Sequence, residues 1–156
     1  MSSTALHQLI QTEFDLMQQF FFSLEKENEL LLSSYSNDDL YDLTELKNHY
    51  ADQLAHAATE RDAALSSLGL STGRDGLIAA QALSEPLHGL VQSLFDLAEK
   101  ARLLNEENGL LIHTYLEYSV QALEALGQAN PANNEVYDAK GKAYAATRLK
   151  RGIVRV

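Results

Sequence analysis

The stretch that decides the fold is residues 87–126, LHGLVQSLFDLAEKARLLNEENGLLIHTYLEYSVQALEAL. Its apolar positions recur at alternating spacings of three and four residues, which is the heptad pattern of packed long helices. The seam consists of Leu87, Leu90, Leu94, Leu97, Ala101, Leu104, Asn108, Leu111, Tyr115, Tyr118, Ala122 and Ala125. Pro86 suits a first helical turn, and Gly127 suits a C-cap with Pro131 just beyond it. We therefore expect one helix of about 42 residues, roughly 60 Å long, that ends near Gly127.

Two more long helices are expected before this one, because the first 68 residues contain no glycine. The first is predicted over residues 3–35, with the seam Ile10, Phe14, Met17, Phe21, Leu24, Asn28, Leu31 and Tyr35. Residues 36–39, Ser-Asn-Asp-Asp, supply a turn and an N-cap. The second is predicted over residues 39–68, with the stripe Leu43, Leu46, Tyr50, Leu54, Ala57, Arg61, Leu65 and Leu68.

The segment between the second and the last long helix is predicted to be a loop followed by a short helix. Gly69, Gly73 and Gly76 interrupt the periodicity within eight residues. Residues 77–83 then suit a short helix, and residues 84–86, Ser-Glu-Pro, suit a new helix start.

We expect the second helix to fold back on the first, and the last helix to fold back on the second. Equal rise per residue then makes the last helix overshoot the first hairpin by around ten residues. The overshoot carries Tyr118, Leu123 and Leu126. An apolar stripe without an intramolecular partner is a candidate docking site.

The predicted fold is therefore all-α: an antiparallel long-helix bundle, or coiled-coil hairpin, with three long helices, one short helix and no strand. Residues 1–128 form the helical bundle. Residues 129–156 form a flexible basic C-terminal tail, because their glycines and basic residues leave no periodic apolar face.

Charge is distributed unevenly along the 156 residues. Residues 1–128 carry 20 Asp and Glu against 6 Lys and Arg, whereas residues 129–156 carry 2 against 6. The acidic body disfavours nucleic acid as a partner. Cysteine is absent, which excludes disulfides and thiolate metal sites. No apolar run approaches the ~18 residues of a membrane span, and no signal peptide is expected at the N-terminus.

Polar residues interrupt the apolar seams at a few positions. Asn28 and Asn108 suit register-setting positions. The two hairpin folds bring them near one level with Lys47, so a shared polar layer of these three residues is a hypothesis. Tyr115 and Tyr118 are either core aromatics or part of a wet edge, because a tyrosine hydroxyl needs a polar partner.

Nothing in the sequence indicates catalysis. Glu85 and His88 match the Glu-x-x-His pattern of di-iron bundles, but only one copy is present and it contains Pro86. His56 and His88 lack the following residues that are usual for a histidine-phosphotransfer site. No glycine-rich phosphate loop is present either. We therefore expect a protein that is not an enzyme, with no catalytic residue, no metal ion and no other cofactor.

Residues 102–112, RLLNEENGLLI, resemble the signature of the FlgN family, approximately Asn-x-x-Asn-Gly-x-Leu on the last long helix. Residues 121–126 continue the helix as they do in that family. In the tail, Tyr137-Asp-Ala-Lys-Gly141 is similar to the family's Tyr-x-Ala-x-Gly element, and residues 150–156 are similar to its basic, apolar-tipped end. A weaker match lies at Lys47, Leu54 and Arg61.

The resemblance implies a cytoplasmic type III export chaperone for the flagellar hook-associated, or hook-filament junction, proteins. Such a chaperone masks the terminal amphipathic helices of its substrates, prevents premature assembly and delivers them to the cytoplasmic domain of the export gate. No nucleic-acid binding or membrane insertion is implied, and a homodimer is left open. The residues implied in substrate binding are Asn105, Asn108, Leu111, Ile112, Tyr115, Tyr118, Leu123 and Leu126. Those implied in gate docking are Tyr137 and Gly141.

Two other functional classes remain open from the residues alone. A histidine-phosphotransfer protein, or another helical-bundle signalling adaptor, would show acid-labile phosphorylation of one histidine. A self-assembling coiled-coil tether would associate strongly without any partner.

Overall fold

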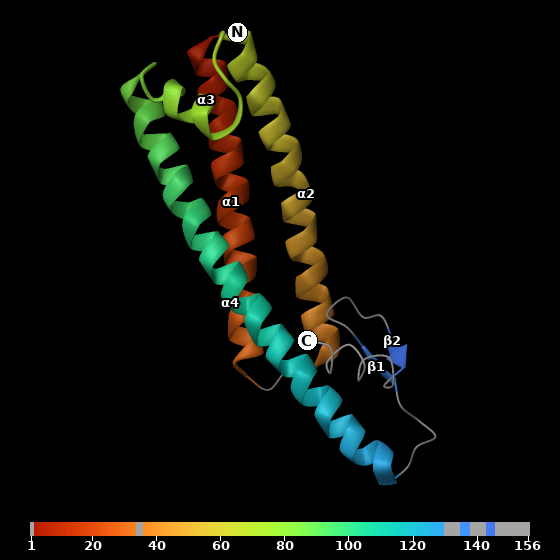
Figure 1. The fold of residues 1–156 in the computed structure, drawn as a ribbon. Helices are drawn as coiled ribbons and strands as arrows, with labels where there is room; N and C mark the ends of the chain where they lie inside the picture. Colours follow the sequence, from red (N-terminus) through yellow and green to blue (C-terminus); the bar gives the residue numbers. More distant parts are fainter. Residues whose placement is uncertain (1, 34–35, 130–134, 138–142, 146–156) are drawn as a thin grey trace.

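The computed structural model describes residues 2–33, 36–129, 135–137 and 143–145. Within these ranges the chain forms α1 (Ser3–Leu31), α2 (Asn37–Ser67), α3 (Gly73–Ala80) and α4 (Glu85–Ala129). Figure 1 shows α1 and α4 running in the same direction, with α2 antiparallel to both and α3 at the end where the chain begins. The predicted all-α bundle of three long helices and one short helix is confirmed.

The N-cap of α2 is Ser36, within the segment 36–39 that was predicted to supply the turn and the N-cap. The Ser36 hydroxyl accepts a hydrogen bond from the backbone N–H of Asp39 (3.1 Å), as an N-cap does. The prediction that the first helix reaches Tyr35 is wrong, because α1 ends at Leu31. Its terminal carbonyls are satisfied locally, since the N–H of Ser33 donates to the carbonyl of Leu30 (3.1 Å).

The prediction that Gly73 and Gly76 belong to a loop is also wrong. Both lie in α3, which begins at Gly73 and ends at Ala80, whereas a helix over 77–83 was expected. Gly73 has φ +69°, a left-handed conformation that favours glycine. Gly76 is buried, and a Cβ there would overlap the carbonyl oxygen of Ser71. Gly73 therefore allows a backbone conformation that other residues rarely adopt, and Gly76 allows α3 to approach the backbone of Ser71 closely.

Helix α4 continues beyond the expected C-cap at Gly127 and ends at Ala129. Positive φ angles occur only at Gly69 and Gly73 in the described part of the chain. Gly127 therefore does not adopt the left-handed conformation that ends many helices. The long helix predicted from residues 87–126 is confirmed, and its C-terminal boundary is corrected.

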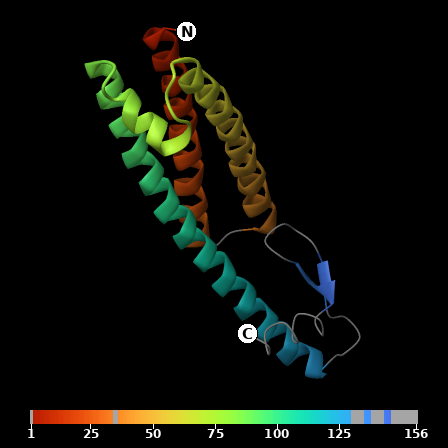
Figure 2. The same ribbon diagram turned by 45° about the horizontal axis from the view of Figure 1, so that its top comes forward.

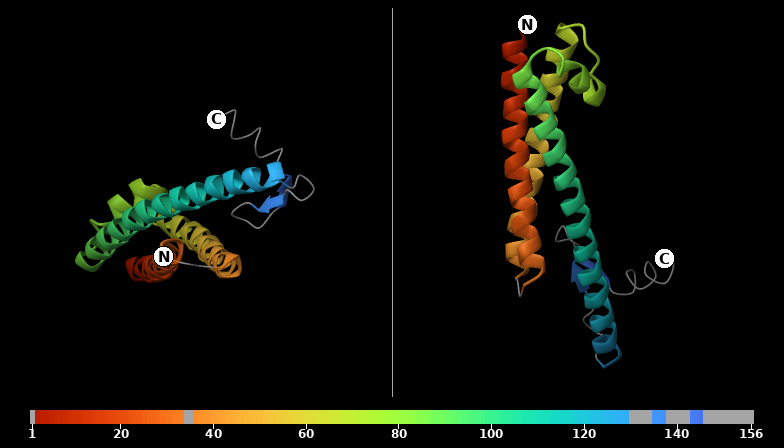
Figure 3. Two further views of the ribbon diagram at one scale, coloured as in Figure 1. Left: turned by 90° about the horizontal axis from the view of Figure 1, so that it is seen from below. Right: turned by 90° about the vertical axis from the view of Figure 1, so that its left-hand side faces the viewer.

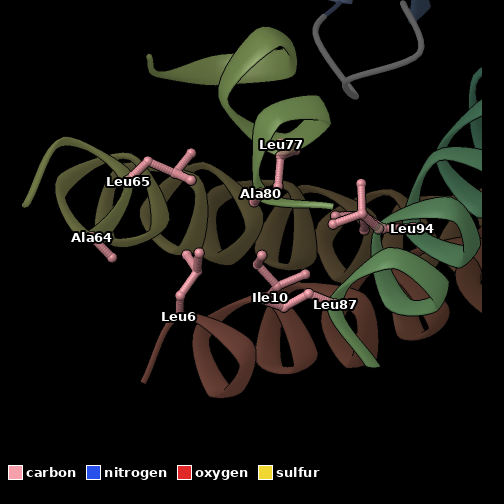
Figure 4. Packing of buried hydrophobic residues seen from close by; sticks show 9 residues of the cluster. Leu6, Ile10, Ala64, Leu65, Leu77, Ala80, Leu87 and Leu94 are labelled. Carbon is pink, nitrogen blue, oxygen red and sulfur yellow. The ribbon is translucent and has the colours of Figure 1, made fainter. Parts of the chain in front are cut away.

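The hydrophobic core lies at the end of the bundle that α3 covers (Figure 4). Leu77 and Ala80 of α3 pack there against the three long helices. The other buried members are Leu6, Ile10, Ala64, Leu65, Leu87, Val91 and Leu94. Each fully buried leucine contributes about 1.5–3 kcal/mol relative to an exposed one. The short helix thus closes the core at this end.

The central helix of the bundle is α1, which packs against both α2 and α4. The expectation that the last helix folds back on the second therefore needs correction, because the main partner of α4 is α1. Between Leu40 and Ala57, α2 has no fully buried side chain. This part of α2 packs on α1 alone, because α4 lies against α1. Leu46, which was expected on the apolar stripe of α2, is therefore exposed.

A two-stranded hairpin is present in the C-terminal segment, where the sequence predicted no strand. Strands β1 (Glu135–Tyr137) and β2 (Ala143–Ala145) pair antiparallel, with Val136 opposite Tyr144. Strand β1 contacts α4. Figure 2 shows the hairpin to one side of the second half of α4. The strands involve six residues, so the architecture remains a helical bundle.

The end of α4 extends past the ends of α1 and α2, as Figure 1, Figure 2 and the right-hand view of Figure 3 show. Asn28 and Asn108 mark one level of the bundle because their side chains are hydrogen-bonded. Helix α1 ends three residues after Asn28, whereas α4 continues for 21 residues after Asn108. We call residues 112–129 the overhang. At 1.5 Å per residue it is roughly 27 Å long, longer than expected.

Candidate functional site

The overhang presents large apolar side chains to solvent. Tyr118 is 73% exposed, Leu126 is 65% exposed and Tyr115 is 42% exposed. Spacings of three, eight and eleven residues place these side chains on one face of the helix. Val120 of the overhang is buried, so the overhang has a covered side as well as an exposed one. The exposed face has the character of a protein-docking surface.

The other residues implied in substrate binding lie in different environments. Asn105 is exposed, whereas Leu111, Ile112 and Leu123 are half-buried. Asn108 is completely buried between helices, so its role in this structure is internal. Of the two residues implied in gate docking, Tyr137 belongs to β1 and Gly141 lies outside the described residues.

A buried polar layer joins α4 to α1 at the base of the overhang. The Asn28 side-chain amide donates to Oδ1 of Asn108 (3.0 Å). The Asn108 amide nitrogen donates to the carbonyl of Leu24 and to Oε1 of Glu27, both at 2.9 Å. The register-setting role expected for the two asparagines therefore has a structural basis, since a shifted register would leave these groups without partners.

Lys47 of α2 joins this layer through Glu27. Its Nζ lies 3.2 Å from Oε2 and 3.4 Å from Oε1 of Glu27. The Glu27 side chain is almost fully buried, while that of Lys47 remains one-fifth exposed. The hypothesis of a layer that contains Asn28, Lys47 and Asn108 is thus confirmed, with Glu27 as its central acceptor.

A second buried ion pair joins α1 to α2 nearer the core. Arg61 donates from Nη1 to Oε1 of Glu13 and from Nε to Oδ1 of Asp62 (3.1 Å). Burial raises the pKa of Glu13 above its ordinary value, and Arg61 opposes that shift. For Asp62, burial acts to raise the pKa, but hydrogen bonds from Gly73 and Arg61 outweigh it and lower the pKa. The Gly73–Asp62 bond (3.0 Å) also ties α3 to α2.

Neither Glu13 nor Glu27 was predicted to lie in a buried ion pair. Glu13 and Glu27 each directly precede a seam residue, Phe14 and Asn28. An acidic residue beside a seam is usually solvated, so it carries no signal alone. The sequence did contain one indication of buried acidic partners: Arg61 lies on the apolar stripe of α2 and Lys47 lies directly beside it.

The remaining charged residues near the family signature are solvent-exposed. Arg102 binds Glu99 through Nη2 (2.7 Å) and Glu106 through Nη1 (2.7 Å) along α4. The hydrogen bond to Glu99 is the largest of the interactions that raise the pKa of Arg102 above its ordinary value, and the charge of Glu106 adds to it. Such exposed pairs support helix α4 weakly.

The histidines show no arrangement of a metal or phosphotransfer centre. His56 lies 3.4 Å from Glu60, and His113 lies 3.2 Å from Glu117, both at exposed positions one helical turn apart. No cluster of three or more potential metal ligands occurs in the residues that the structure describes. The helices of that same part of the chain also contain no segment long and apolar enough to cross a membrane.

An elongated helical bundle with an exposed apolar face on its longest helix has the architecture of one class of protein, helical bundles that pack an amphipathic helix of a partner. Comparison with protein families identifies the particular member of that class. The family model described as FlgN protein matches residues 1–145, so the chain belongs to the FlgN family. No significant match was found among curated proteins or among solved structures.

Membership of this family assigns the general role. FlgN proteins are flagellar export chaperones that bind flagellar proteins, and the family is not an enzyme family. The identity of the bound protein and the contact with the export machinery are separate questions, which depend on individual surfaces of this chain.

Proposed function

We propose that this chain is a cytoplasmic chaperone that binds the terminal amphipathic helices of the hook-filament junction proteins. Binding prevents their premature assembly, and the complex is delivered to the cytoplasmic domain of the export gate. The observation that carries this proposal is the exposed face of the overhang, where Tyr118 and Leu126 lie beyond the end of the α1–α2 hairpin.

An amphipathic substrate helix is the occupant that fits this face. A helix packs its apolar side onto anchors spaced along a partner helix, and tyrosine adds a polar tip at the rim. Leu111, Ile112 and Leu123 are half-buried, so they supply the edge of the same surface, together with Tyr115. Asn105 is the exposed polar contact, whereas Asn108 acts indirectly by fixing the direction of the overhang.

Charge substitution tests the substrate surface. In the double variant Tyr118→Glu/Leu126→Glu, the apolar face is lost, so the variant should no longer copurify with a junction protein. Leu103→Glu is the matched control, because Leu103 is a 52% exposed leucine on α4 outside the overhang. Far-UV circular dichroism should be unchanged for both proteins. Retention of the junction protein by the double variant would contradict this proposal.

Gate docking is proposed for Tyr137 and Gly141, following the family resemblance. Tyr137→Ala should weaken binding to the gate's cytoplasmic domain and leave the junction protein bound. Tyr144→Ala is a matched control, because Tyr144 lies on the paired strand β2. If Tyr137→Ala instead released the junction protein and kept the gate, the tail would belong to the substrate surface.

A second copy of the chain is the competing occupant of the overhang. Light scattering over a range of concentrations measures this directly. A dimer that Tyr118→Glu converts to a monomer would show that the same face serves self-association, and substrate binding would then require dissociation.

A further inference from the structure

The buried polar layer contains a dipeptide, Asn108-Gly109, whose chemistry neither proposed binding surface uses. Side-chain deamidation of asparagine is fastest before a glycine, because glycine has no side chain to hinder its own backbone nitrogen. No other asparagine of the 156 residues precedes a glycine. The layer at the base of the overhang therefore holds the asparagine of this chain that is most prone to the reaction.

The fold of α4 does not require a glycine at position 109. Gly109 lies inside the helix, and its φ angle is not positive. A Cβ at this position would meet no atom within 4 Å, in contrast to Gly76. Alanine would therefore fit, and it would favour the helix because glycine is the poorer helix former. What Gly109 does determine is the reactivity of the asparagine before it.

The folded protein protects Asn108 in two ways. Gly109 is part of α4, so its N–H donates to the carbonyl four residues earlier and its nitrogen is held away from Cγ of Asn108. The Asn108 side chain is also fully buried. Its amide nitrogen donates to Leu24 and Glu27 at 2.9 Å, and its Oδ1 accepts from Asn28 at 3.0 Å. Attack on Cγ therefore requires that the helix and the polar layer open together.

We propose that Asn108 is a latent deamidation site, which the polar layer keeps unreactive and which reacts in molecules whose layer has opened. In the open state the backbone nitrogen of Gly109 attacks Cγ of Asn108. The new N–Cγ bond forms as the Cγ–Nδ2 bond breaks, and ammonia leaves with the proton of the attacking nitrogen. Water then adds to one of the two carbonyl–nitrogen bonds of the resulting succinimide ring. The product is aspartate or isoaspartate at position 108.

The reacted chain does not rebuild the layer. Aspartate places a second carboxylate where the Asn108 amide donates to Glu27, so a donor–acceptor pair becomes a pair of like charges. Isoaspartate instead inserts a methylene carbon into the backbone of α4. Each reacted chain therefore loses the contact that fixes the base of the overhang. The polar layer thus sets the chemical lifetime of the protein as well as the register of its helices.

Peptide-mapping mass spectrometry of the full-length protein at mildly alkaline pH tests the proposal. No partner is needed, so the result is independent of the proposed function. Deamidation appears as a one-dalton gain at residue 108. The protein unfolded in guanidinium chloride should convert at least about a hundredfold faster than the folded protein, because the folded rate follows the small open fraction. Comparable rates in the two states would overturn the proposal.

Two variants separate opening of the layer from unfolding of the whole bundle. Asn28→Ala removes the donor to Oδ1 of Asn108, so the folded variant should deamidate about fivefold faster than the wild type, or more. Ile10→Val is the matched control, because it weakens the core at the other end of the bundle and leaves the layer intact. An Ile10→Val protein that converts as fast as Asn28→Ala would show that the layer is not the protecting element.

The role of the Gly109 nitrogen is tested in the Asn28→Ala background. Adding Gly109→Ala should slow deamidation by at least about tenfold relative to adding Gly89→Ala. Both glycines lie in α4 with open space around the position of a Cβ, so both changes stabilise the helix similarly. Only Gly109→Ala hinders the attacking nitrogen. Equal rates for the two double variants would overturn the assignment of that nitrogen as the nucleophile.

Discussion

The side-chain amide of Asn108 donates to the carboxylate of Glu27 across 2.9 Å, which connects the polar position of the α4 seam to a buried acid of α1. This contact lies where α1 nears its end and α4 continues alone. It therefore fixes both the register of the two helices and the level at which the overhang begins.

Loss of the Asn108 side chain should destabilise the protein. Asn108→Ala removes both donors to Leu24 and Glu27 and leaves buried acceptors unpaired, which costs about 1–3 kcal/mol for each unsatisfied group. Urea unfolding followed by circular dichroism measures the change. Asn105→Ala, at an exposed position one turn away, should change stability by less than about 0.5 kcal/mol. Equal stability of the two variants would remove the structural role assigned to Asn108.

The Glu27–Lys47 pair should behave as a buried ion pair in a double-mutant cycle. Lys47→Met leaves the Glu27 charge buried without a cation and should cost about 3 kcal/mol. Adding Glu27→Gln removes that charge and keeps an acceptor for Asn108. The double variant should therefore be more stable than Lys47→Met alone. Additive losses would show that the two side chains do not interact.

The two acids on Arg61 should give opposite pH dependence. The folded-state pKa of Glu13 is raised above its ordinary value of 4.5, so its contribution to stability decreases as pH rises through the window above 4.5. The folded-state pKa of Asp62 is lowered below 3.8, so its contribution is present above 3.8 and is lost as pH falls below it.

Unfolding measured from pH 3 to pH 7 should separate the two effects. The stability of the wild type relative to Glu13→Gln should decrease as pH rises, and its stability relative to Asp62→Asn should increase. The same sign for both differences would contradict the assignment of burial and hydrogen bonding as the dominant causes.

Two kinds of glycine should respond oppositely to alanine. Gly76→Ala forces a Cβ onto the Ser71 carbonyl oxygen and should cost about 1–3 kcal/mol or more. Gly89→Ala places a Cβ in open space within α4 and should stabilise the protein by about 0.5–1 kcal/mol. Thermal unfolding compares them. A stable Gly76→Ala protein would mean that α3 can shift away from the preceding loop.

Removal of the C-terminal tail should leave the bundle folded. All members of the main core cluster lie between Leu6 and Leu94, far from the end of α4. A chain truncated after residue 128 should keep its helical circular dichroism and its cooperative unfolding, and proteases should attack the tail first in the full chain. An unfolded truncated protein would show that residues 129–156 complete the core.

The periodic seams were sufficient to predict the three long helices. Alternating spacings of three and four predicted three long helices, and Ser36 with the following acidic residues predicted the start of α2. The family signature at Asn105, Asn108 and Gly109 predicted the family. These features are local, so the sequence alone carries them.

Boundaries and partners depended on tertiary contacts. The sequence alone could not show that α4 packs mainly on α1, because an apolar seam has no information about which helix covers it. Glu27 became the centre of the polar layer only when Asn108 and Lys47 approached from two other helices. Gly73 and Gly76 were assigned to a loop, but they allow α3 to pack against Ser71 and Asp62. The sequence thus determined which segments are helical and amphipathic, whereas the tertiary structure decided which faces stay exposed, because exposure is set by neighbours distant in the chain.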